Sequence, residues 1–104
     1  MHVVVSYLAD CPNWRLAEQR LRQALAEIGR PDMTLSLMLV ETEADAAAAG
    51  FAGSPTFTVD GLDLFDTSAP VGVLACRVYR TSTGLAGVPD AADLAAALTE
   101  KVPR

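Results

Sequence analysis

Hydrophobic positions in the first third of the chain change from a strand pattern to a helix pattern. Residues 2–8, HVVVSYL, are β-branched and aromatic with apolar residues on both faces, which predicts a strand covered on both sides. From about Asn13 to Ile28 the apolar residues recur at spacings of three and four, which predicts a helix with one buried stripe: Trp14, Ala17, Leu21, Ala24, Leu25 and Ile28. Leu16 lies off the stripe and should be partly exposed, and Gly29 and Pro31 end the helix.

A second strand and a short helix follow. Residues 34–41, TLSLMLVE, predict a strand with Leu35, Leu37 and Leu39 on one face and Met38 and Val40 on the other. The sequence TEAD has the spacing of a capping box, with Thr42 before the helix and Asp45 at its third position. The alanine run to Ala49 is then a helix closed by Gly50 and Phe51. Two parallel strands joined by the first helix form a right-handed crossover.

The second half of the chain predicts two more strands and a helix. Residues 56–61 are a third strand entering a turn, and residues 62–72 form an irregular excursion without a clear period. Residues 73–80 alternate between two faces, with Leu74, Cys76 and Val78 on one and Arg77 and Tyr79 on the other. This pattern is typical of an antiparallel strand with one more solvent-exposed face. Arg77, Tyr79 and Arg80 are then the solvated face of an edge strand or, alternatively, a basic-aromatic patch.

The end of the chain predicts a loop and a last helix. Residues 82–87, STGLAG, are a loop, and residues 89–102 are a helix capped near Asp90 that packs through Leu94, Leu98 and Val102. Lys101 and Arg104 suit the negative C-terminal end of that helix.

Length and composition narrow the class of protein. A chain of 104 residues is one domain, residues 1–104, and half of its residues are hydrophobic. A net charge of −5 argues against a nucleic-acid groove or an anionic membrane surface, and no apolar run is long enough to cross a bilayer. Two cysteines without an export signal predict a cytoplasmic protein with reduced thiols. One histidine and two distant cysteines predict no metal site, and we expect no cofactor.

Two separated motifs resemble the thioredoxin superfamily. ADCPNW stands where that superfamily has Cys-x-x-Cys, and GFAGSPTFTVDG is similar to its segment in which a cis-proline precedes the third strand. The ending TGLAGVPDAADLAAAL also fits the closing turn and last helix of that family. The resemblance, closest to small bacterial thioredoxin-like proteins, implies an α/β thioredoxin-like fold in the order β-α-β-α-β-β-α, with a mixed sheet flanked by helices. Trp14 replaces the second cysteine of the motif.

The resemblance makes Cys11 the candidate catalytic residue. It places the thiol at the N-terminus of the first helix, where unpaired amides and the helix dipole stabilise an anion by about 0.3–2 kcal/mol. The adjacent Asp10 opposes this by a comparable amount, so a modestly reactive thiol is expected. Such a thiol attacks a disulfide, and an outside thiol such as glutathione then resolves the mixed disulfide. A cysteine hydrolase is disfavoured, because His2, an exposed terminal residue, precedes a strand whose far end carries Cys11.

The same resemblance implies a substrate-binding surface formed by Pro12, Trp14, Ser54 and Pro55. Pro55 is expected to be cis, and Ser54 would offer its backbone to a bound peptide or to glutathione. A turn proline that needs no ligand is the alternative. Trp14 is either an aromatic packed under the start of the helix or a platform beside the thiol.

Cys76 is a possible second thiol. It could resolve a mixed disulfide at Cys11 only if the two Cα atoms lie within about 7 Å. The predicted strand starts far from the active end, which favours Cys76 as a small buried hydrophobic residue.

Three functions therefore remain. The first is a monothiol oxidoreductase at Cys11 whose partner is a protein disulfide or a small thiol. The second is a non-catalytic thioredoxin-like binding module, and the third is a dithiol enzyme that uses Cys76. Whether the protein is an enzyme stays open at this point.

Overall fold

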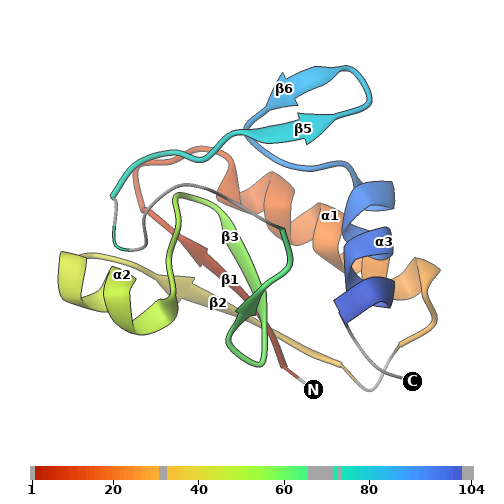
Figure 1. Ribbon diagram of the computed structural model, residues 1–104, viewed down its shortest axis with the longest axis horizontal. Coiled ribbons are helices and arrows are strands. Elements are labelled where there is room, and N and C mark those ends of the chain that lie inside the picture. The colour runs from red at the N-terminus through yellow and green to blue at the C-terminus, as the bar shows by residue number, and fades with distance from the viewer. Residues whose placement is uncertain (1, 31–32, 66–71, 73, 102–104) are drawn as a thin grey trace.

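Four strands form one mixed sheet in the computed structural model, which describes residues 2–30, 33–65, 72 and 74–101. In chain order the elements are β1 (His2–Tyr7), α1 (Trp14–Glu27), β2 (Thr34–Leu39), α2 (Glu43–Ala49), β3 (Thr56–Val59), β4 (Leu62–Asp63), β5 (Tyr79–Thr81), β6 (Gly84–Ala86) and α3 (Ala91–Lys101). The sheet has the order β2-β1-β3-β4, and β5 and β6 form a separate two-stranded sheet. The protein is therefore a mixed α/β structure (Figure 1).

β1 lies inside the sheet and sets its register. It pairs in parallel with β2 from His2 opposite Thr34 to Tyr7 opposite Leu39, and antiparallel with β3. The parallel pair is possible because α1 carries the chain back to the starting edge, as the sequence predicts. β3 and β4 form a short hairpin whose two turn residues, Asp60 and Gly61, both have positive φ angles.

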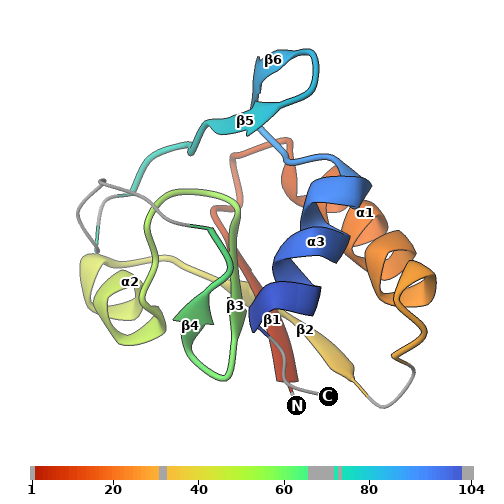
Figure 2. The same cartoon turned by 45° about the vertical axis from the view of Figure 1, so that its right-hand side comes forward.

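The core lies between the sheet and the pair α1 and α3. Most of its buried residues come from β1, β3, α1 and α3: Val3, Val5, Phe57, Val59, Ala17, Leu21, Ala24, Leu94, Ala97 and Leu98. Met33, Leu64, Val88 and Tyr79 of β5 also belong to it. A smaller cluster of Val40, Ala46 and Phe51 joins α2 to the end of β2. Figures 1 and 2 show α2 on the opposite side of the strands from α1 and α3.

The helices agree with the sequence pattern. α1 spans all but the ends of the predicted range, and Leu16 is 40% exposed, as expected for a residue off its stripe. α2 ends at Gly50, which has the left-handed conformation. Thr42 caps α2 by accepting a hydrogen bond from the Asp45 amide at 3.1 Å, whereas the Asp45 carboxylate accepts from Glu41 rather than from Thr42 as in a full capping box.

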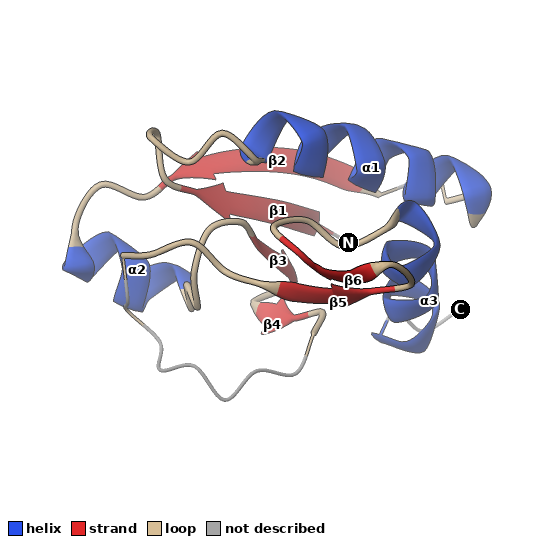
Figure 3. Ribbon diagram, turned by 90° about the horizontal axis from the view of Figure 1, so that it is seen from above, coloured by secondary structure: helices blue, strands red, loops and turns tan. Residues whose placement is uncertain are grey.

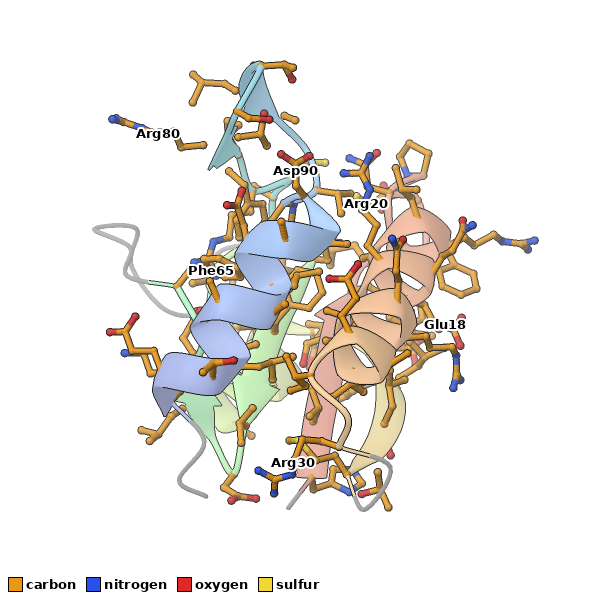
Figure 4. The ribbon with its side chains drawn as sticks, turned by 90° about the vertical axis from the view of Figure 1, so that its right-hand side faces the viewer. Glu18, Arg20, Arg30, Phe65, Arg80 and Asp90 are labelled. Carbon is orange, nitrogen blue, oxygen red and sulfur yellow. The ribbon has the colours of Figure 1, made fainter. Side chains whose placement is uncertain are left out.

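The segment just before α3 is tied to the middle of α1. The Arg20 guanidinium donates to the carbonyl oxygens of Val88 and Pro89 at 3.3 and 3.1 Å, and it lies 4.0 Å from the Asp90 carboxylate. Figure 4 shows Arg20 and Asp90 directed toward each other between the two helices. Leu94 and Leu98 are fully buried, as predicted. The predicted contact of Val102, the roles of Pro31 and Arg104, and residues 66–71 of the excursion lie outside the described residues.

The prediction of a fourth strand over residues 73–80 is wrong. Within the described residues of that range, Cys76 forms only an isolated bridge to Ser54, and the strand β5 begins at Tyr79 and pairs with β6. The fourth strand of the main sheet is instead β4, which lies in the predicted excursion. Residues 84–86 of the predicted loop form β6, so β5 and β6 make a hairpin that projects beyond the helices (Figures 1 and 2).

Candidate functional site

Three segments that are far apart in the sequence meet at one end of the sheet. They are the connection from β1 to α1, the loop before β3, and the segment that leads to β5 (Figure 3). The first carries Cys11, the second carries Ser54 and Pro55, and the third carries Cys76. Contacts among these residues define the candidate site.

Ser54 joins the three segments and is fully buried. Its hydroxyl oxygen accepts a hydrogen bond from the Leu8 amide at 3.0 Å. Its own amide donates to the Ala75 carbonyl at 2.8 Å, and its carbonyl accepts from the Arg77 amide at 2.9 Å. Both backbone groups that we expected to meet a bound peptide are therefore engaged by the protein's own segment 75–77.

The peptide bond between Ser54 and Pro55 is cis, as expected. Pro55 is buried, and its carbonyl accepts a hydrogen bond from the hydroxyl of Tyr79. The loop before β3 is thus held to the segment 75–79 on both sides of this peptide bond. Neither Ser54 nor Pro55 presents an open surface in this arrangement.

Cys11 is buried, with only 2% of its surface exposed. Its amide donates to Leu8 at 3.1 Å, in the turn that precedes α1. In the described part of the chain its sulfur makes hydrogen bonds with the Ser54 carbonyl at 3.8 Å and with Cys76, and not with amides of α1. The thiol thus lies next to the start of α1, where the sequence predicts it, but it is buried beside Cys76, which the sequence does not indicate.

The two sulfur atoms lie 3.7 Å apart, and the Cys76 thiol donates to the sulfur of Cys11. Both cysteines are free thiols, and Cys76 is exposed. The prediction that Cys76 is a small buried hydrophobic residue far from the site is wrong. Its bridge to Ser54 brings it there, whereas the sequence pattern predicts a regular strand over this segment.

The hydrogen bond to Cys11 raises the pKa of the Cys76 thiol. The negative charge of Cys11, partial burial and the charge of Asp10 act in the same direction. The Cys76 thiol is therefore harder to deprotonate than an isolated cysteine thiol.

An ion pair that the sequence did not indicate fixes the segment around Cys76. Arg77 is 7% exposed and donates to both carboxylate oxygens of Asp63, at 2.8 and 3.4 Å, and to the Phe65 carbonyl at 3.2 Å. Its guanidinium also lies 4.7 Å from the centre of the Tyr79 ring. Burial raises the pKa of Tyr79 well above its ordinary value. Arg77 and Tyr79 thus form the inner face of this segment, and their assignment to a solvated face is wrong.

Trp14 lies at the start of α1 and is half-buried. Its ring stacks on that of Tyr7 with 4.8 Å between centres, and the Arg15 guanidinium lies 5.0 Å from it. It is not one of the buried residues of the core, and within the described part of the chain the hydrogen bonds of the Cys11 sulfur go to Ser54 and Cys76. Pro12, predicted with it as part of a binding surface, is exposed beside the buried thiol.

Comparison of the chain with protein-family models, with curated proteins and with solved structures gives no significant match. In the portion that the structure describes, no three residues of His, Cys, Asp and Glu are grouped so that they could hold a metal ion. None of the helices described is both long and apolar enough to span a bilayer.

Proposed function

We propose that the protein is a thioredoxin-like thiol–disulfide exchange protein whose redox pair is Cys11 and Cys76. The observation that carries this proposal is the 3.7 Å separation of the two sulfur atoms. Two free thiols at this distance need only a small movement to reach the bond length of a disulfide, about 2.05 Å. The pair differs from Cys-x-x-Cys because its second thiol comes from a distant segment.

The thioredoxin-like fold is part of the proposal. It is supported by the order β2-β1-β3-β4, by the parallel pairing of β1 with β2 and by the antiparallel pairing of β1 with β3. The position of Cys11 directly before α1, next to the loop with a cis peptide bond at Pro55, supports it further.

Exposure assigns different roles to the two thiols. An incoming disulfide meets the exposed Cys76, whereas Cys11 lies beneath it. The Cys76 thiolate attacks one sulfur of the disulfide R–S–S–R, which forms a mixed disulfide and releases one thiolate of R. The Cys11 thiolate then attacks the sulfur of Cys76, and the second thiolate of R leaves. The substrate disulfide gains two electrons, the protein pair loses them, and the protons of the two cysteines pass through water to the released thiolates.

Because each step is reversible, the oxidised pair is reduced by an outside thiol that attacks Cys76, with Cys11 as the leaving group. A glutathione-like small thiol or a protein dithiol satisfies this chemistry. The monothiol mechanism at Cys11 stays a prediction, and the low exposure of Cys11 is unfavourable to it.

Incubation of the reduced protein with glutathione disulfide, followed by acid quenching and intact mass spectrometry, tests the proposal. Wild type should lose the mass of two hydrogens as the internal disulfide forms. Cys11→Ser should stop at a glutathione adduct on Cys76, and Cys76→Ser should react slowly, because Cys11 is buried. A stable adduct on Cys11 in wild type would support the monothiol mechanism instead. The absence of any oxidised product would leave the binding module as the function.

A further inference from the structure

We infer that Arg77 is a positioning residue of the proposed redox pair: its partly buried ion pair with Asp63 holds Cys76 against Cys11. This inference rests on the proposed function and names the interaction that determines how readily the internal disulfide forms. In the described part of the chain the Arg77 guanidinium is hydrogen-bonded to Asp63 and Phe65 and not to either sulfur, so it would act through the backbone next to it.

Cys76 lies between two backbone hydrogen bonds to the same residue. The Ser54 amide donates to Ala75 at 2.8 Å, and the Arg77 amide donates to Ser54 at 2.9 Å. Two bonds to one residue form a single isolated bridge rather than a ladder. Two backbone hydrogen bonds contribute only about 0.5–1.5 kcal/mol each, so a bridge of this size opens readily unless side chains hold it.

The Arg77 side chain supplies that anchor on the inner side. Its guanidinium donates three hydrogen bonds, two to the Asp63 carboxylate in β4 and one to the Phe65 carbonyl. The Arg77 and Asp63 side chains are 5% and 22% exposed, so solvent screens the pair weakly. The planar, forked guanidinium fixes a direction as well as a distance, which a lysine ammonium would not do.

Tyr79 completes the inner face of the segment. Its ring packs against the Arg77 guanidinium and against Phe57 and Phe65, and its hydroxyl donates to Pro55. Residues 77 and 79 are therefore buried, whereas Cys76 is exposed although its sulfur meets that of Cys11. The anchor lies one residue from the thiol, so a shift of Arg77 moves the sulfur of Cys76 directly.

The consequence is a high effective concentration of one thiol relative to the other. An internal disulfide competes with a mixed disulfide to glutathione, and the ratio of the two reports how well the pair is held together. Removal of the anchor should lower that ratio, because Cys76 would then sample positions away from Cys11. Among the described residues of the segment 74–79, Tyr79 alone belongs to the buried core cluster between α1, α3 and the sheet.

The experiment equilibrates the protein with glutathione buffers of graded ratio and measures the reduced, mixed and internally oxidised forms by mass spectrometry after acid quenching. We expect Arg77→Ala to lower the equilibrium constant for the internal disulfide at least about tenfold, which raises its reduction potential by about 30 mV. Arg77→Lys and Asp63→Asn should raise the reduction potential by a smaller amount. These two variants replace Arg77→Ala if that protein does not fold. Arg80→Ala is the matched control, because Arg80 is exposed on β5 and extends away from the core in Figure 4.

Circular dichroism and urea unfolding of each variant identify those that are folded at the assay temperature. Folded Arg77 or Asp63 variants with the reduction potential of wild type would overturn the inference and leave the proposed function intact. A wild type that forms no internal disulfide in any buffer would overturn both. A fall in potential on loss of Arg77 would also contradict the inference, since it would mean that the ion pair holds the thiols apart.

Discussion

The close approach of Arg77 to Gly53 gives a sharp test of how the segment 75–77 lies on the rest of the protein. A Cβ atom built on Gly53 would come within 2.8 Å of the Cβ and 3.2 Å of the Cα of Arg77. Carbon atoms in contact prefer separations of about 3.5–4.0 Å, so Gly53→Ala requires one of the two segments to move by about 1 Å. Gly53 also has a φ of +107°, which a residue with a side chain rarely adopts.

The two effects can be separated because the chain offers a matched position. Gly84 has a φ of +116° but nothing within 4 Å of its added Cβ. Gly84→Ala should therefore carry only the backbone strain, about 1–3 kcal/mol. Gly53→Ala carries that strain together with about 1–3 kcal/mol for overpacking, hence about 2–6 kcal/mol in total. The gain from a stiffer unfolded chain, about 0.4–1 kcal/mol, is the same for both.

Urea unfolding followed by circular dichroism gives the two free energies. We expect Gly53→Ala to lose more stability than Gly84→Ala and, where it remains folded, to form the internal disulfide less readily than wild type. A Gly53→Ala protein that is as stable as Gly84→Ala and retains the wild-type disulfide equilibrium would refute the placement of Arg77 against this loop. The same result would also contradict the claim that the segment 75–77 holds Cys76 next to Cys11.

Three further predictions concern the core, the buried tyrosine and the coupled thiols. Leu21→Ala should cost about 2–5 kcal/mol in urea unfolding because Leu21 is fully buried, whereas Leu16→Ala should cost less than about 1 kcal/mol; equal losses would contradict the assigned stripe. Burial raises the pKa of Tyr79, so the unfolded chain loses this proton first and stability should fall as pH rises above about 10. Tyr79→Phe should be less stable near neutral pH but should lack that alkaline decline, and an unchanged decline would count against a buried hydroxyl. Cys11→Ala removes the hydrogen bond and charge that raise the pKa of Cys76, so the pH midpoint for iodoacetamide alkylation of Cys76 should fall; an unchanged or higher midpoint would argue against the contact.

Much of the fold follows from local patterns. The stripe of α1, the cap at Thr42 and the end of α2 at Gly50 are encoded within a few residues of each element, so the sequence predicts them well. The parallel pairing of β1 and β2 follows from the crossover that α1 makes. These features depend on the periodicity of neighbouring residues and on general rules for how strands and helices are connected. Both can be applied to a single sequence.

The segment 74–79 shows where such patterns mislead. Its alternation is real, but the inward face carries Arg77 and Tyr79 and the outward face carries Leu74 and Val78. A period of two identifies two faces without saying which is buried. Burial of Arg77 depends on Asp63, which is 14 residues away in the sequence and comes into contact only through the tertiary structure.

The same limit applies to the candidate site. Cys11 and the loop at Ser54 and Pro55 were identified by resemblance, and the structure brings them together. The approach of Cys76 could not be predicted, because the range 73–80 was assigned to the main sheet. Two sequence features could have indicated that this segment is buried. Arg77 and Tyr79 follow closely after Cys76, and an acidic residue that could pair with the arginine, Asp63, stands in the otherwise apolar LDLF of residues 62–65.

The separation of the two thiols along the chain links oxidation to folding. Cys11 and Cys76 are 65 positions apart, so a bond between them would close a loop of more than half the polypeptide. Restriction of the unfolded chain by such a loop corresponds to about 4 kcal/mol. In a thermodynamic cycle the same free energy makes the folded protein about a thousandfold easier to oxidise than its unfolded chain. An oxidant that joins these thiols would thus also protect the molecule against denaturation, and a reductant would reverse both effects together.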